Sequence, residues 1–140
     1  MDKRRFIFFN FSIIKLLIKN KPHDKITLIT DSMRAKYLPE GLSELGGQEV
    51  IVKNGEARLK NGALAGSILK MNDAIKNLVL SCNVRFTVAV DFATVNPGKN
   101  LNIFDSVGSI EVGKKANLTV LDGEFNVKTT IRNGLIIYKA

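Results

Sequence analysis

One short segment, residues 25–30 (KITLIT), constrains the fold more than any other part of the sequence. It is rich in β-branched residues and apolar on both faces, a pattern that favours a strand buried in a parallel sheet over a solvated antiparallel strand. The rest of the chain predicts no second strand of this kind. A lone parallel strand would leave its backbone N–H and C=O groups unpaired. We therefore expect this segment to belong to a larger α/β sheet.

Three helices are predicted around this strand, covering residues 12–20, 67–80 and 87–95. Ser67 is a suitable N-cap for the second helix. The Asn-Pro-Gly triplet at 96–98 is expected to end the third helix. The first helix carries apolar residues on one face and lysines on the other, as a surface helix does.

The remaining segments predict a loop, a hairpin and a small sheet. Residues 31–47 are expected to form a loop, and residues 48–59 a β-hairpin that turns at Asn54-Gly55. After Gly108, four short strands are predicted at 109–112, 118–121, 127–131 and 135–138. Turn residues separate these strands, so the C-terminal part is expected to be a small antiparallel sheet.

The net charge of +8 comes from 21 basic residues that are scattered along the chain. No helix-turn-helix spacing or RNA-binding aromatic signature accompanies them. This distribution favours a solvated basic surface that attracts an anionic small molecule, and we expect no nucleic-acid partner. The apolar stretch at 6–18 is interrupted by polar residues and is shorter than the roughly 20 residues that span a bilayer, so no membrane segment or signal peptide is expected.

The chain contains one cysteine, Cys82, and one histidine, His23, which could form a nucleophile pair. Cys82 follows an apolar run, which favours a buried and inert thiol. His23 lies before the predicted strand and is expected to be an exposed loop residue. A single cysteine excludes an intramolecular disulfide and is compatible with a cytoplasmic protein.

Asp31 directly follows the predicted strand. A carboxylate at the C-terminal end of a parallel barrel strand lies on the face where such barrels have their active sites. Beside a metal-bound water it could accept a proton and later return it to the leaving group. The alternative is a turn or cap residue, a position that aspartate favours.

A series of motifs along the chain resembles one enzyme family. In order they are LITDSM (28–33), LGGQ (45–48), VKNG (52–55), LAGS (64–67), NDAIKN (72–77), NPGK (96–99), GSIEVGK (108–114), ANLTVLD (116–122) and TIRNG (130–134). The series is similar to the N-acetylglucosamine-6-phosphate deacetylases of the amidohydrolase superfamily. The last motifs identify the broad superfamily, whereas residues 30–71 are more specific. Gly98 stands where the family has alanine.

The resemblance implies an α/β fold: the C-terminal part of a metal-dependent-hydrolase (β/α)8 barrel and part of a small β-sandwich domain. The barrel portion would span residues 12–107, with a hairpin insert near 48–59, and the sandwich portion residues 108–140. A complete barrel of this type takes about 250 residues.

The resemblance also implies an activity, the hydrolysis of N-acetylglucosamine 6-phosphate to glucosamine 6-phosphate and acetate. Asp31 would act as general base and then general acid. Leu64, Ala65 and Gly66 would contact the sugar substrate through their backbone, although an ordinary tight turn before a helix is the alternative. The family implies a divalent metal such as Zn²⁺ and a homodimer.

The sequence departs from the family in its metal ligands. The histidine-containing metal motif and the family's glutamate and histidine ligands are absent, and His23 matches none of them. We therefore expect no metal ligand in this chain and no activity of the chain alone. Residues 1–11 diverge from the family and are interpreted as altered sequence at a truncation point. The alternatives are complementation by a separate N-terminal half, a non-catalytic sugar-phosphate-binding or partner-subunit module, and a non-functional remnant.

Overall fold

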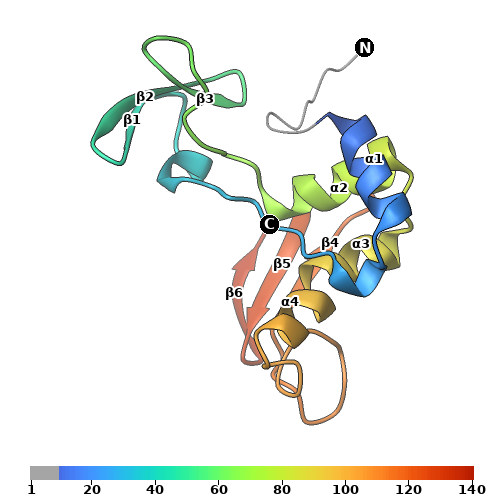
Figure 1. Ribbon diagram of the computed structural model, residues 1–140. Helices are drawn as coiled ribbons and strands as arrows, with labels where there is room; N and C mark the ends of the chain where they lie inside the picture. The colour runs from blue at the N-terminus through green and yellow to red at the C-terminus, as the bar shows by residue number, and fades with distance from the viewer. Residues whose placement is uncertain (1–9) are drawn as a thin grey trace.

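The computed structural model describes residues 10–140. Figure 1 shows a group of helices with one small sheet standing apart from it and a second sheet beside it. The predicted divergent segment, residues 1–11, lies almost entirely outside the described residues. In chain order the elements are α1 (Phe11–Asn20), η1 (His23–Lys25), η2 (Arg34–Tyr37), β1 (Gly41–Leu45), β2 (Gln48–Lys53), β3 (Glu56–Leu59), α2 (Met71–Cys82), α3 (Phe86–Ala93), α4 (Val95–Asn100), β4 (Leu118–Leu121), β5 (Val127–Arg132) and β6 (Leu135–Lys139).

The helices α1, α2 and α3 share a hydrophobic core. Phe92 of α3 and Leu78 of α2 are 1% and 3% exposed, and Ile14 and Ile18 of α1 pack against this core. The prediction of the first helix is confirmed, and the side chain of Asn10 caps it by accepting a hydrogen bond from the Ser12 amide at 2.9 Å.

Two predicted helix boundaries are wrong. The second helix begins at Met71, and Ser67 lies four residues before it, so Ser67 is not its N-cap. The Asn-Pro-Gly triplet does not end helical structure, because it lies inside α4. Pro97 occupies the first turn of α4, where a helix needs no amide hydrogen from that residue.

The predicted strand at 25–30 does not form: Lys25 belongs to η1, and residues 26–30 have no regular secondary structure. Its side chains Ile26 and Leu28 pack against the helical core, and the Leu28 amide donates a hydrogen bond to the Phe92 carbonyl at 2.8 Å. Ile29 remains 70% exposed. Within residues 10–140 no strand lies beside this segment to pair with it, which is the physical reason for the difference.

The first sheet is an antiparallel meander in the order β1-β2-β3. The predicted hairpin is confirmed, and Asn54 and Gly55 both have positive φ, as a two-residue turn between strands requires. The prediction of a loop at 31–47 is wrong in part, because η2 and β1 lie within it. A second small core holds this sheet together, and it includes Met33, Ala35, Val50, Val52, Ala57 and Ala65.

The second sheet is the antiparallel meander β4-β5-β6, as predicted. The prediction of a strand at 109–112 is wrong. That stretch is irregular and is held by the buried side chain of Lys114, whose ammonium group donates to the Ser109 hydroxyl at 2.6 Å and lies 3.5 Å from the centre of the Phe104 ring. None of the helices in the described part of the chain is both long and apolar enough to cross a bilayer.

Candidate active site at Asp31

Asp31 lies where segment 25–30 meets the chain returning from the first sheet. The next residue, Ser32, forms a parallel β-bridge with Ser67. Two hydrogen bonds strengthen this junction: the Met33 amide donates to the Ser67 carbonyl at 2.8 Å, and the Ser32 hydroxyl donates to the Leu69 carbonyl at 2.5 Å. Asp31 itself has a φ of 49°, a left-handed conformation that aspartate tolerates better than most residues. The junction therefore fixes the backbone on the C-terminal side of Asp31.

The predicted substrate-contacting residues Leu64, Ala65 and Gly66 lie along the first sheet. Leu64 forms an antiparallel bridge with Arg58, and the Ala65 amide donates to the Ala57 carbonyl at 2.9 Å. Ala65 is also buried, and its amide hydrogen is already used in this bond. These contacts lead the chain back from β3 towards Ser67 and the junction with Asp31.

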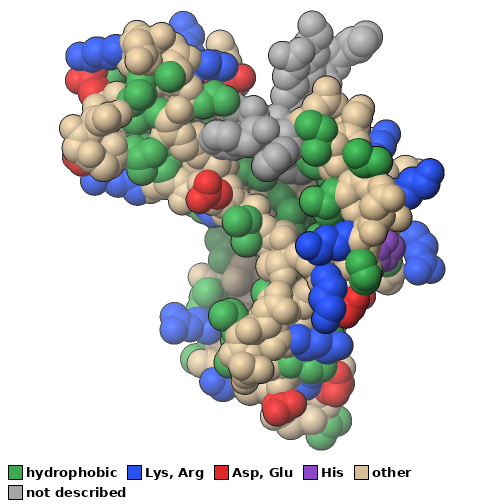
Figure 2. Space-filling model, viewed as in Figure 1, with side chains coloured by type: hydrophobic (Ala, Val, Ile, Leu, Met, Phe, Trp, Pro, Cys, Tyr) green, Lys and Arg blue, Asp and Glu red, His purple; other side chains and the backbone are tan. Residues whose placement is uncertain are grey.

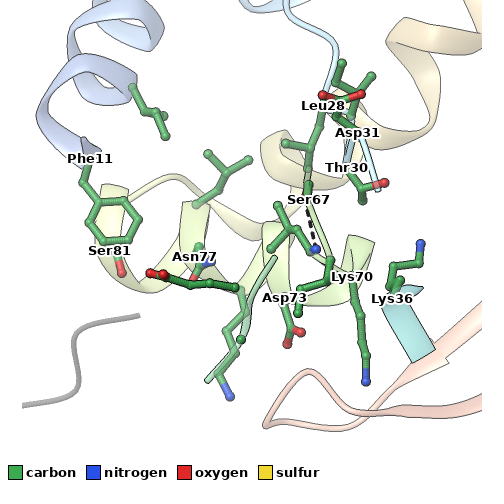
Figure 3. A pocket seen from close by; sticks show the side chains of 18 of the residues that line it. Phe11, Leu28, Thr30, Asp31, Lys36, Ser67, Lys70, Asp73, Asn77 and Ser81 are labelled. Carbon is green, nitrogen blue, oxygen red and sulfur yellow. Dashed lines mark hydrogen bonds between the residues drawn. The ribbon is translucent and has the colours of Figure 1, made fainter. Parts of the chain in front are cut away.

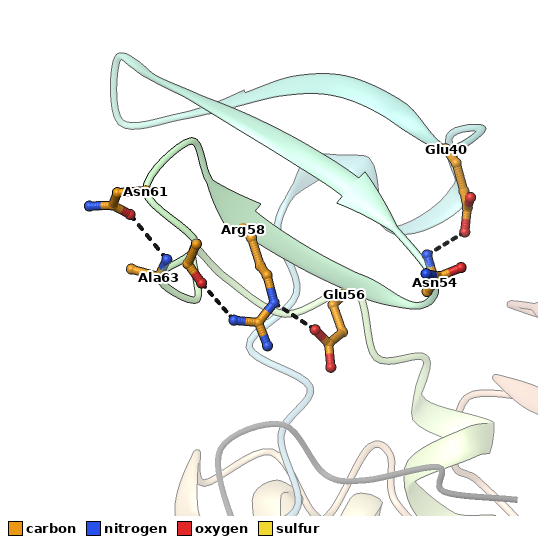
Figure 4. A network of polar contacts seen from close by, with 7 residues as sticks. Glu40, Asn54, Glu56, Arg58, Asn61 and Ala63 are labelled. Carbon is orange, nitrogen blue, oxygen red and sulfur yellow. Dashed lines mark hydrogen bonds and ion pairs between the residues drawn. The ribbon is translucent and has the colours of Figure 1, made fainter.

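Polar contacts fix the turn that precedes these residues (Figure 4). The Arg58 side chain pairs with Glu56 at 2.7 Å and donates to the Gly62 carbonyl at 2.6 Å. The Ala63 amide donates to the Asn61 side chain at 3.0 Å. The turn is therefore held by its own residues.

Asp31 lines a large open pocket of about 900 Å³. Figure 3 shows Asp31 and Ser67 in this pocket together with Lys70 and Asp73 from the start of α2. Leu64, Ala65 and Gly66 do not line it. Asp31 therefore lies close to the segment that begins at Ser67, and Ser67 lines the pocket whereas the three residues before it do not.

Sequence reasoning missed two lysines in this pocket. The ammonium groups of Lys36 and Lys70 lie 5.3 and 5.0 Å from the centre of the same Tyr37 ring. Both lysines line the pocket that contains Asp31. Their proximity could not be predicted, because the two lysines are far apart in the sequence and their segments meet at the junction between Ser32 and Ser67.

The residues of the Asp31 pocket do not make a complete metal site. Across residues 10–140, no three side chains of His, Cys, Asp or Glu gather where they could hold an ion. A catalytic zinc ion takes three protein ligands. The Asp31 carboxylate has no hydrogen bond or ion pair with any other residue in the described part, so it is available to a group outside this set. The described residues therefore do not fit a metal centre by themselves.

The predicted burial of Cys82 and exposure of His23 are confirmed, but His23 begins the short helix η1 and does not lie in a loop as predicted. Cys82 is buried, 7% exposed, and His23 is exposed with its ring edge against Phe92. Both line a second pocket of about 360 Å³, but no hydrogen bond joins their side chains in the described structure. Burial raises the pKa of the Cys82 thiol, and the nearby charge of Lys15 opposes this effect. A thiol with a raised pKa is a poor nucleophile near neutral pH, so the two residues are not a nucleophile pair.

Curated relatives and solved structures resemble this chain closely. It is 43% identical over 124 residues to the N-acetylglucosamine-6-phosphate deacetylase of Bacillus subtilis, an alignment that covers 89% of this chain and 31% of the relative. The crystal structure of the Pasteurella multocida deacetylase superimposes with a TM-score of 0.87 at 31% identity, covering 93% of this chain and 34% of that one. For the Thermotoga maritima deacetylase the TM-score is 0.85 at 34% identity, covering 96% and 37%.

The chain spans about a third of the length of the curated relatives it matches. The likeness to these solved structures supports the α/β fold of a metal-dependent hydrolase. The model of the amidohydrolase family matches residues 15–137, which include the first sheet, the second sheet up to the middle of β6, all but the first turn of α1, and the junction beside Asp31. The chain therefore belongs to the amidohydrolase family.

Proposed function

We propose that this chain supplies the proton-transfer carboxylate and part of the sugar-binding wall of an N-acetylglucosamine-6-phosphate deacetylase. The observation that supports the proposal is the bridge between Ser32 and Ser67, because Asp31 precedes Ser32 and the segment 64–66 precedes Ser67. These residues lie 33 or more positions from Asp31 in the sequence, yet they adjoin the same junction.

In the proposed reaction, Asp31 accepts a proton from the attacking water as the acetamide carbon is attacked. It then donates that proton to the departing amine, so that glucosamine 6-phosphate and acetate leave. The exposed Asp31 carboxylate, open to the pocket of about 900 Å³, supports this role. Leu64, Ala65 and Gly66 do not line this pocket, so the proposed contact of their backbone with the sugar would lie just beyond it.

The amidohydrolase family is generally metal-dependent. A bound divalent ion lowers the pKa of water to about 7 in favourable sites. Because the described residues do not form a complete metal site, we propose that the ligands come from a separate N-terminal half or from a homodimer partner. We place this enzyme in the cytoplasm, in keeping with its single cysteine.

We further propose that residues 12–107 form part of a (β/α)8 barrel and residues 108–140 part of a β-sandwich. The unpaired segment 25–30 supports the first proposal, since a neighbouring strand would satisfy its backbone. The apolar side chains of β6 support the second, because Leu135, Ile136 and Ile137 are 72%, 63% and 61% exposed. A second sheet packed on this one would cover side chains of this kind.

The proposal is tested in two steps. First, the chain alone is assayed for acetate release from N-acetylglucosamine 6-phosphate with excess Zn²⁺, and no turnover above an Asp31→Asn variant is expected. Second, the matching segment of the Bacillus subtilis deacetylase is replaced by this chain. The chimaera is expected to bind metal and deacetylate the substrate, and a folded, metal-loaded but inactive chimaera would contradict the proposal.

A second candidate function is binding of a sugar phosphate without chemistry. Lys36 and Lys70 favour it, because two cations line the pocket of Asp31 and neither has an ion pair with a described residue. In that case glucosamine 6-phosphate would raise the melting temperature of the chain in the absence of metal.

A further inference from the structure

The second pocket, of about 360 Å³, lies apart from Asp31 and has a basic rim. Lys15 and Lys19 of α1, His23 of η1 and Arg85 before α3 line it. All four side chains belong to exposed residues. Figure 2 shows a histidine, coloured purple, among Lys and Arg side chains on one flank of the molecule. Because the chain has one histidine, that side chain is His23.

The positive charges on this rim are not compensated by the part of the chain that the structure describes. No Asp or Glu is among the lining residues, and Lys15, Lys19 and Arg85 form no ion pair with any of residues 10–140. Lys15 and Lys19 are four positions apart on one helix, a spacing at which like charges repel. The rim therefore gathers cations at an electrostatic cost that a bound anion would relieve.

The position of Arg85 is unfavourable for a positive charge. Arg85 is the N-cap residue of α3, where the helix dipole disfavours a positive charge. The first turn of α3 contains no acidic residue, and no side chain caps its amides. The local structure of α3 thus gives no reason for a cation here, whereas the convergence of Arg85 with Lys15 and Lys19 on one pocket does.

The buried part of the pocket lining is apolar. Cys82 and Val84, 7% and 8% exposed, lie there, with Ile18 and Val88 half-buried beside them. Burial raises the pKa of the Cys82 thiol, and the charge of Lys15 opposes this effect. A cavity of this size, with an apolar buried lining and a few convergent polar groups, matches the usual form of a small-molecule site.

We propose that this pocket binds the phosphate group of a small phosphorylated molecule between Lys15, Lys19 and Arg85. A guanidinium group and two ammonium groups match the charge and the oxygen atoms of a phosphate dianion. The site shares only Ile18 with the pocket of Asp31, among the residues that line both. It does not depend on the deacetylase activity proposed above.

Calorimetric titration of the chain tests this site. The probes are inorganic phosphate and glucosamine 6-phosphate, with glucosamine as the control that lacks phosphate. Binding of both phosphates is expected, and the double variant Lys15→Gln/Arg85→Gln is expected to weaken it at least about tenfold, since charged hydrogen bonds each contribute that much or more. The matched control is Lys53→Gln/Arg132→Gln, which removes the same charge from two exposed residues elsewhere and should change the affinity less than about twofold.

Asp31→Asn is expected to leave the binding of inorganic phosphate at the rim unchanged, which separates the site from the proposed active site. Equal weakening in both double variants, absence of phosphate binding, or a preference for a short oligonucleotide that the rim variant abolishes would each overturn the proposal. Should the rim variant fail to fold, the single thiol gives a second measurement on the unmodified chain. Phosphate is expected to slow the reaction of Cys82 with a neutral maleimide, and an unchanged rate at saturating phosphate would contradict the assignment.

Discussion

Ser32 and Ser67 form a parallel β-bridge between two segments that are 35 positions apart in the chain. The Met33 amide donates to the Ser67 carbonyl across this junction at 2.8 Å. The bridge is the point at which the end of segment 25–30 meets the chain that returns from the first sheet. Asp31 precedes it on one side and Gly66 on the other, so changes in either segment are expected to reach the candidate site.

Gly66 is expected to tolerate no side chain. Its φ is 128°, and a Cβ atom would lie 3.1 Å from a methyl carbon of Leu45 and 3.3 Å from the sulfur of Met33. Gly66→Ala is therefore expected to lower the free energy of unfolding by about 2–3 kcal/mol, from backbone strain and crowding together. Urea denaturation followed by circular dichroism measures this loss.

The matched control for Gly66→Ala is Gly62→Ala. Gly62 also has a positive φ, 84°, but nothing lies within 4 Å of its Cβ position. Its alanine variant should therefore cost only the strain of the left-handed conformation, about 1–2 kcal/mol. Equal losses at the two positions would show that Gly66 is not crowded.

Asn96 is expected to be essential for the packing of segment 25–30 on the helices. It is 4% exposed, and its side-chain amide donates to the His23 and Ile26 carbonyls at 2.7 and 2.6 Å. Asn96→Ala would leave the Ile26 carbonyl unpaired near the core and should cost about 2–3 kcal/mol in thermal or urea unfolding. Asn100→Ala is the control, because its exposed side chain donates to Thr27 and should contribute less than about 1 kcal/mol. Equal stability of the Asn96→Ala and Asn100→Ala variants would contradict this expectation.

Asp122 is expected to make the free energy of unfolding depend on pH in the acidic range. Its carboxylate accepts hydrogen bonds from the Asn126 amide, the Asn126 side chain and the Glu124 amide, at 2.8, 3.1 and 2.9 Å. The backbone bond from Asn126 is the main cause that holds the pKa of Asp122 below its ordinary value. A lowered pKa means that the stabilisation is complete above the unfolded value of about 3.9 and is lost as the pH falls through the folded value.

Unfolding measured from pH 6 to pH 2 checks this expectation. The chain should lose more stability below about pH 4 than an Asp122→Asn variant, which does not titrate. Because Glu44 and Glu111 also have lowered pKa values and are present in both proteins, the difference between the curves reports Asp122 alone. Parallel curves would mean that this turn does not hold the carboxylate.

The elements that could be predicted from sequence are those determined by nearby residues. The hairpin at 48–59 follows from the Asn54-Gly55 turn, and the helix predicted at 12–20 follows from its apolar spacing. The elements that could not be predicted depend on distant partners. β1 exists because it pairs with β2, and segment 25–30 lacks a strand beside it within the described residues.

The same distinction holds for the candidate site. The position of Asp31 directly after segment 25–30 could be read from local sequence. The bridge between Ser32 and Ser67 could not be predicted, since neither residue carries a signal for the other. The basic pocket could not be predicted either, because Lys15, His23 and Arg85 come from three separate parts of the chain.

The role of Asp31 is tested most directly in the active chimaera with the Bacillus subtilis deacetylase. Asp31→Asn is expected to lower kcat about 10²–10⁴-fold, the usual effect of removing a general acid–base, with metal content unchanged. The control Asp91→Asn alters an exposed carboxylate on α3 and should retain full activity. An Asp31→Asn chimaera that keeps its metal and turns over as fast as the Asp91→Asn control would contradict the account.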